Sequence, residues 1–69
     1  MNTLRELRKA YPQAITTSGN IYYIDGLGWY RQRNTPFGLE TSYKDFNDNW
    51  SRTSFEKLVE EVEQWHGRG

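Results

Sequence analysis

Acidic side chains gather in the second half of the chain, at spacings that suit recognition of a basic partner. Glu56, Glu60 and Glu63 recur every three or four residues, so they form one stripe if this segment is helical. Asp45 and Asp48 lie shortly before the same segment. A surface of carboxylates attracts a basic protein surface. These residues are therefore candidate partner-binding residues, and a merely solvated helix face is the alternative interpretation.

Aromatic and basic residues alternate around the dipeptide Asp25-Gly26. Rings with arginines beside them can stack on the bases of a single-stranded nucleic acid. Successive strand residues point to opposite sides, so Tyr30 faces solvent if Trp29 faces the core. Tyr30 and Arg31 are therefore also candidate binding residues, and ordinary core and edge packing is the alternative. The whole set comprises Tyr22, Tyr23, Trp29, Tyr30, Arg31 and Arg33.

Few residues in the chain are suited to catalysis. The chain holds no Cys and a single His, His66, which lies where we expect a helix to end. It has neither a G-x-S-x-G motif for a nucleophilic serine nor a glycine-rich loop for phosphate. We therefore predict a non-enzymatic protein with no catalytic residues and no cofactor.

The acidic segment before the last predicted helix matches a calcium-binding loop only in part. Asp45, Asn47 and Asn49 fall at its first, third and fifth positions, and Glu56 falls at its last. Trp50 stands at the sixth position, where the sharp turn of such a loop needs Gly. We therefore expect Asx turns in this segment and no metal site.

Length and composition limit the classes of protein to which the chain can belong. A chain of 69 residues predicts a single small domain over residues 1–69. Its 9 basic and 9 acidic residues give zero net charge, which argues against a generic DNA-binding protein. Residues 1–33 nevertheless carry a basic excess, and residues 34–69 carry an equal acidic excess. No apolar run is long enough to cross a membrane and no export signal is evident, so we expect a cytoplasmic protein.

The first half of the chain predicts a short helix followed by antiparallel strands. Thr3 and Glu6 have the spacing of a capping box, and Pro12 excludes a helix beyond residue 11, so residues 3–11 should be helical. Asp25-Gly26 is typical of a two-residue hairpin turn of type I′. Runs of β-branched and aromatic residues predict strands at 14–17, 21–24, 27–33 and 39–43, with a turn at 34–38.

The last element should be an amphipathic helix. Ser51 or Thr53 should cap its first turn, and Gly67 should end it. Its apolar side chains fall within an arc of about 120° on a helical wheel: Phe55, Leu58, Val59, Val62, Trp65 and His66. Because aliphatic residues are few, the first candidates for the core are aromatic: Trp29, Trp50, Trp65, Phe37, Phe46 and Phe55.

Together these elements predict an α+β fold. A three- to four-stranded antiparallel sheet is flanked by a short N-terminal helix and a longer C-terminal helix, in the order α-β-β-β-α. Each helix has one apolar side, which must be buried against the sheet.

With no site for chemistry, the predicted function is that of a non-enzymatic interaction protein. The chain begins at Met1 and reads as a complete small open reading frame. Its size is typical of the stoichiometric inhibitors that phages and mobile elements encode, such as anti-CRISPR proteins and antitoxins. We expect it to bind, as a monomer or homodimer, a larger protein that is basic or binds nucleic acid. One alternative is a small regulator that binds nucleic acid directly through the hairpin, and another is a structural phage component.

Overall fold

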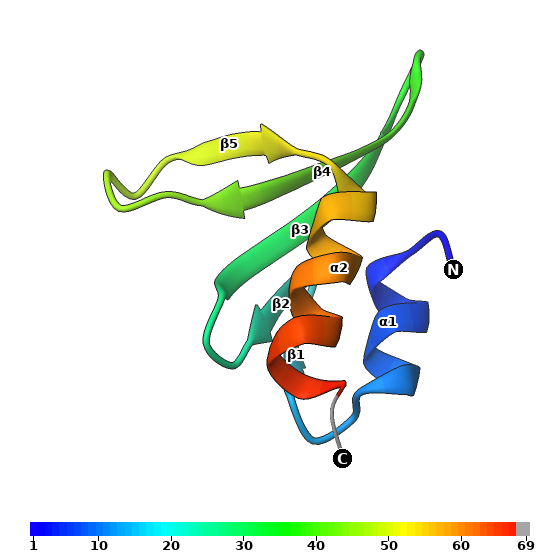
Figure 1. Cartoon of the computed structure of the whole chain (residues 1–69). Coiled ribbons are helices and arrows are strands. Elements are labelled where there is room, and N and C mark those ends of the chain that lie inside the picture. Colours follow the sequence, from blue (N-terminus) through cyan, green and yellow to red (C-terminus); the bar gives the residue numbers. More distant parts are fainter. Residues whose placement is uncertain (68–69) are drawn as a thin grey trace.

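In the computed structural model, which describes residues 1–67, two helices cover one face of a five-stranded antiparallel sheet (Figure 1). Each strand pairs with the one that follows it in the chain, so the sheet is a continuous meander. The predicted α+β class is confirmed, whereas the expected three or four strands were too few. The elements are α1 (Leu4–Ala10), β1 (Ile15–Ser18), β2 (Ile21–Ile24), β3 (Gly28–Thr35), β4 (Gly38–Lys44), β5 (Trp50–Thr53) and α2 (Phe55–His66).

The additional strand, β5, occupies residues that we expected to form a loop and the start of the last helix. It pairs with β4, with Trp50 opposite Lys44 and Thr53 opposite Thr41. Consequently α2 begins later, and its N-cap is Ser54, whose hydroxyl accepts a hydrogen bond from the Lys57 N–H. The expected caps Ser51 and Thr53 were both wrong, because these residues belong to the strand.

The turn between β2 and β3 also differs from the prediction. Ile24 pairs with Gly28, which leaves a loop of three residues rather than two. Gly26 has φ 83°, whereas Asp25 does not have the positive φ that a type I′ turn requires. The Leu27 N–H closes the turn by donating to the Ile24 carbonyl at 2.9 Å.

Helix α1 starts as predicted and is held on the sheet by both apolar and polar contacts. Thr3 and Glu6 form the capping box, and Leu4 and Leu7 are buried. The Leu4 N–H, which is free in the first turn of a helix, donates to the Gln32 side-chain oxygen on β3 at 2.8 Å. Gln32 in turn donates to the Thr41 hydroxyl on β4 at 2.9 Å.

The core lies between the helices and the sheet, and it is mainly aliphatic. The expected aromatic core was wrong, because most of the large rings point to solvent instead of into this layer. Of the six aromatic candidates only Phe55 packs partly against it, whereas Leu58 and Val62 of the same helix are fully buried. The buried hydrophobic residues are Leu4, Leu7, Ala14, Ile15, Ile24, Tyr30, Leu58 and Val62.

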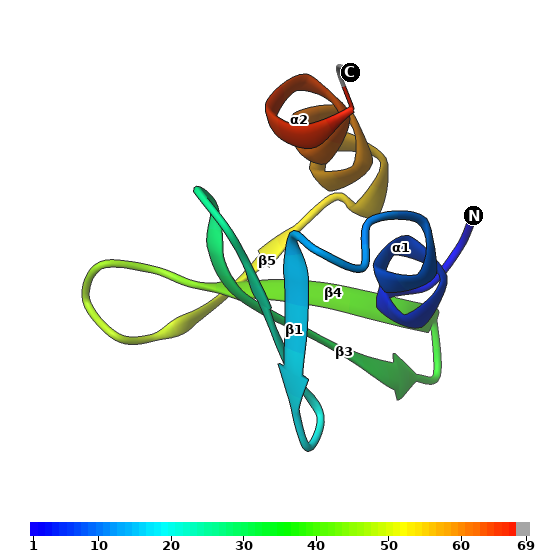
Figure 2. The same ribbon diagram turned by 90° about the horizontal axis from the view of Figure 1, so that it is seen from below.

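Helix α2 ends on the turn between β2 and β3, and both views show the two helices side by side on one face of the sheet (Figures 1 and 2). The His66 Nε2 lies 2.7 Å from the Asp25 carbonyl. Trp65 is 64% exposed, yet a Cβ at Gly26 would stand only 3.4 Å from its ring. In residues 1–67 no helix has the length and apolarity that crossing a membrane requires.

Candidate functional site

The side of the sheet that faces away from both helices is the main candidate site, and we call it the open face. Side chains alternate between the two faces of a strand, so the neighbours of buried Ile24 and Tyr30 point away from the helices. The strand register places on the open face Ile21, Tyr23, Trp29, Arg31, Arg33, Glu40, Ser42, Lys44, Trp50 and Arg52. Figure 2 shows α1 and α2 together on the opposite side.

Trp29, and not Tyr30, is the exposed ring of the β2–β3 hairpin. Tyr30 is 6% exposed and belongs to the core, whereas Trp29 is 45% exposed. The expected binding role of Tyr30 is therefore corrected, because its side chain lies under the helices. Trp29 is supported by Tyr23 on the adjacent strand, with ring centroids 4.9 Å apart. The open face thus presents a braced aromatic surface to solvent.

Two cationic side chains lie against the second tryptophan of the open face. The Arg31 guanidinium carbon lies 4.3 Å from the centre of the Trp50 ring, and the Lys44 ammonium lies 5.0 Å from it. Both are cation–π distances. The buried Nε of Arg31 makes no hydrogen bond to any residue in 1–67. Arg31 therefore lies on the open face, where stacking on Trp50 rather than an ion pair holds it.

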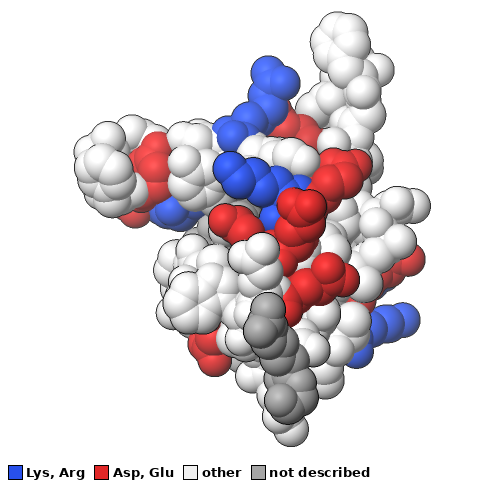
Figure 3. Space-filling model, in the orientation of Figure 1, with Lys and Arg blue, Asp and Glu red and all other residues white. Residues whose placement is uncertain are grey.

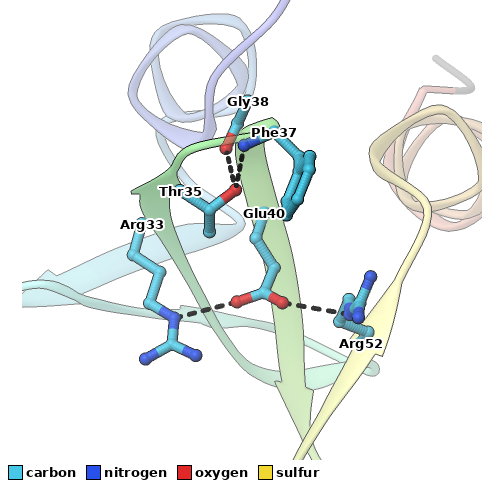
Figure 4. Close-up of polar contacts among 6 residues, drawn as sticks. All are labelled: Arg33, Thr35, Phe37, Gly38, Glu40 and Arg52. Atoms are coloured by element: carbon cyan, nitrogen blue, oxygen red, sulfur yellow. Dashed lines mark hydrogen bonds and ion pairs between the residues drawn. The ribbon is translucent and has the colours of Figure 1, made fainter.

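Glu40 links two further arginines of the open face (Figure 4). Its carboxylate accepts a hydrogen bond from Arg33 Nε at 2.8 Å and lies 3.0 Å from Arg52 Nε. The hydrogen bond from Arg33, followed by the charges of the surrounding arginines, lowers the pKa of Glu40. Glu40 therefore stays ionised and aligns two guanidinium groups across β3, β4 and β5. Even with this carboxylate, basic side chains outnumber acidic ones on the open face.

A groove of about 310 Å³ lies on the open face between the two tryptophans. Its walls come from four strands and the loop before β5. Trp29 contributes an exposed ring, and Trp50 contributes the ring against which Arg31 and Lys44 lie. The lining residues are Ile21, Trp29, Lys44, Asp48 and Trp50. Flat aromatic walls beside one positive and one negative side chain are suited to a flat, polar ligand.

The acidic candidates of the β4–β5 loop are engaged within the loop. Asp45 Oδ1 accepts from the N–H groups of Asn47 and Asn49, both at 3.0 Å, and its Oδ2 accepts from the Ser51 hydroxyl at 2.7 Å. These bonds, that of Ser51 foremost, lower the pKa of Asp45. They form the Asx-type turn that we expected here. Asp48 lies 3.6 Å from the Lys44 ammonium, so it belongs to the groove.

The remaining acidic candidates lie on α2, where Figure 3 shows a band of acidic side chains over the helix. Glu56 accepts from the Ser54 hydroxyl at 3.0 Å and so belongs to the helix start. None of the ion pairs within residues 1–67 involves Glu60 or Glu63, and both are exposed. The β4–β5 loop lies away from α2 in both ribbon views. The predicted acidic residues therefore do not form one continuous surface.

Two hairpin tips each expose a phenylalanine almost completely. Phe37, at the β3–β4 tip, is 99% exposed, and Phe46, in the β4–β5 loop, is 97% exposed. Figure 4 shows how Thr35 braces the first tip: its hydroxyl accepts from the Phe37 N–H at 3.1 Å and donates to the Gly38 carbonyl at 2.7 Å. Both phenylalanines were expected in the core, but hairpin tips lie beyond the area that the helices cover.

A second depression lies elsewhere on the described part of the molecule. It measures about 510 Å³ and lies between the N-terminus, the β3–β4 tip and the start of α2. Its charged lining residues are Glu40, Arg52 and Glu56, so it has no excess of positive charge. Within residues 1–67, no group of three or more acidic or histidine side chains is placed to hold a metal ion.

Comparison with known proteins adds no further argument. No family model matches the chain, and neither does any curated protein or solved structure. The case for a function therefore depends on the geometry of the open face and of α2.

Proposed function

We propose that this protein is a non-enzymatic binding protein whose open face binds single-stranded nucleic acid. The observation that carries the proposal is the groove between Trp29 and Trp50, on a face where basic side chains predominate. Proteins that bind single strands combine stacking rings with a positive track for the phosphates. Trp29, which packs against Tyr23, supplies the stacking ring, and the arginines that pair with Glu40 supply the positive charge.

The zero net charge of the chain does not oppose this proposal, because the charges are distributed unequally over the surface. Arg31, Arg33 and Arg52 lie on the open face, whereas Glu60 and Glu63 lie on α2 on the opposite side of the sheet. A phosphate chain on the open face would be separated from Glu60 and Glu63 by the core. Local charge, rather than the total, governs such contacts at physiological salt because screening acts over about 8 Å.

The proposal is tested by titrating the full chain into labelled single-stranded DNA and RNA oligonucleotides and following fluorescence anisotropy at several salt concentrations. We expect binding that weakens as salt rises, because phosphate contacts release counterions. Replacing Trp29 by alanine should weaken binding by about 5- to 140-fold, which corresponds to the roughly 1–3 kcal/mol of one base–aromatic stack.

Trp65→Ala is the matched control, since Trp65 is also an exposed tryptophan but lies on α2. It should leave the affinity close to that of the unmodified chain, and circular dichroism should show that both variants fold. Absence of binding at low salt, or equal losses in the two variants, would show that the open face does not bind single strands.

A second candidate function is supported by the free carboxylates of α2. Glu60 and Glu63 are exposed and take no part in the ion pairs of residues 1–67. We propose that this surface docks a larger basic protein, as an inhibitor of the kind that phages and mobile elements encode, anti-CRISPR-like or antitoxin-like. The open face ranks above it, because a groove with rings and charges defines a ligand more closely than two carboxylates do.

A further inference from the structure

The groove on the open face has a polar rim as well as aromatic walls. Lys44 and Asp48 both line it, with the ammonium nitrogen 3.6 Å from the Asp48 Oδ1. The Asp48 side chain is 87% exposed, so its carboxylate keeps free acceptor sites for a ligand. A ligand in the groove therefore meets a donor and an acceptor next to each other.

The position of Asp48 is set by the loop that carries it. Its backbone has φ 65°, a left-handed conformation that few residues other than Gly, Asn and Asp adopt readily. Its N–H donates to the Asp45 carbonyl at 2.9 Å. The Asp45 carboxylate in turn holds the N–H groups of Asn47 and Asn49 and the Ser51 hydroxyl. Asp45 is thus a positioning residue, and the carboxylate it places at the groove is that of Asp48.

The nucleobases differ in the hydrogen-bond donors and acceptors that they present to an adjacent ammonium and carboxylate, such as those of Lys44 and Asp48. Guanine alone presents two adjacent N–H donors on its Watson–Crick edge, with a carbonyl oxygen beside them. A carboxylate accepts both donors together, and an ammonium group donates to the carbonyl. Uracil and thymine place a carbonyl on each side of a single N–H, so their edges repel a carboxylate. Adenine and cytosine offer one amino group next to a ring nitrogen acceptor.

We infer that the groove selects guanine from a single-stranded nucleic acid. The base stacks on Trp29, its two N–H donors meet Asp48, and its carbonyl meets Lys44. The arginines that flank the groove contact the phosphates of neighbouring nucleotides. This inference rests on the proposed function, because it assigns a base preference to the same face.

The test compares the anisotropy titrations of uracil-only RNA oligonucleotides with those that carry one central guanine. The unmodified chain should bind the guanine oligonucleotide about 5- to 140-fold more tightly, the discrimination that one bidentate base contact provides. Asp48→Asn should reduce this ratio toward one, and asparagine tolerates the positive φ of this position. Asp25→Asn is the control, since it removes the same charge from the β2–β3 turn and should leave the ratio unchanged.

The uracil-only oligonucleotide separates base selection from simple electrostatics. Removing the Asp48 charge should leave its affinity unchanged or raise it, because the phosphates then meet one negative charge fewer. Equal affinity of the unmodified chain for both oligonucleotides, or an unchanged ratio in Asp48→Asn, would overturn the guanine inference and leave the proposed function standing. If the unmodified chain binds neither oligonucleotide, the guanine inference and the proposed function are both overturned.

Discussion

At the scale of single residues, Trp29 and Tyr30 show how far the burial of a side chain could be predicted from the sequence. Alternation along a strand predicts that one of the two rings is buried, and the structure shows that it is Tyr30. The sequence did contain a signal for this choice. Arg31 and Arg33 share the face of Trp29, and two arginines are costly to bury without partners.

The burial of Tyr30 predicts a stability change at alkaline pH. Burial first, and then the charge of Glu61, raises the pKa of Tyr30 to about 12. An unfolded tyrosine ionises near pH 10, so the stabilisation is complete below about pH 10 and is lost as the pH rises toward about 12. The urea midpoint should therefore fall across this range.

Tyr30→Phe provides the control for this measurement, because it keeps the buried ring and removes the ionising group. The urea midpoint of this variant should fall less between about pH 10 and pH 12 than that of the unmodified chain. Parallel decreases in the two proteins would contradict a specific contribution from Tyr30.

Secondary-structure elements were predictable where their pattern is strong. The boundaries of α1 and of β1 to β4 lie within two residues of those expected from capping, turn and strand signals. Strand β5 was missed because Trp50–Thr53 is short and polar and lies at the edge of the sheet, where only one side pairs with a neighbour. Missing it also hid the groove, since Trp50 and Lys44 meet only through the pairing of β4 with β5.

The start of α2 provides a prediction at the scale of elements. Ser54→Ala removes the hydroxyl that accepts the Lys57 N–H, and it should lower the free energy of unfolding by about 1 kcal/mol. Ser54→Asp keeps an acceptor at the N-cap and should retain most of the stability. Urea denaturation followed by circular dichroism measures both. An unchanged midpoint for Ser54→Ala would mean that this hydroxyl does not stabilise the helix.

At the scale of the whole molecule, the fold gathers four basic side chains on the open face and places both basic and acidic side chains on the helices. Arg31 and Arg33 are joined on the open face by Lys44 and Arg52, whereas Arg5, Arg8 and Lys9 lie on α1, on the same side of the sheet as the acidic residues of α2. This arrangement could not be derived from sequence, because it depends on which face the helices cover.

Charge reversal of α2 tests whether its acidic surface contributes to function. The double variant Glu60→Lys and Glu63→Lys should fold, since both side chains are exposed, but should lose salt-sensitive binding to basic proteins. The unmodified chain and the double variant are each immobilised and exposed to a lysate. The proteins that each one captures are then identified by mass spectrometry and compared.

The double variant Arg5→Glu and Arg8→Glu on α1 controls for surface charge in general. It should capture the same basic proteins as the unmodified chain, or more of them. If the folded α2 variant also captures the same proteins as the unmodified chain, the acidic surface is not a binding site.

The composition of the core has a consequence for how the chain folds during its synthesis. Each strand pairs with its sequence neighbour, so the meander can form while the chain emerges. Leu58 and Val62, however, lie on α2, which is made after all five strands, and they cover the inner side of the sheet. A nascent chain that lacks α2 would expose Ile15, Ile24 and Tyr30, so stable folding must await the emergence of this helix from the ribosome.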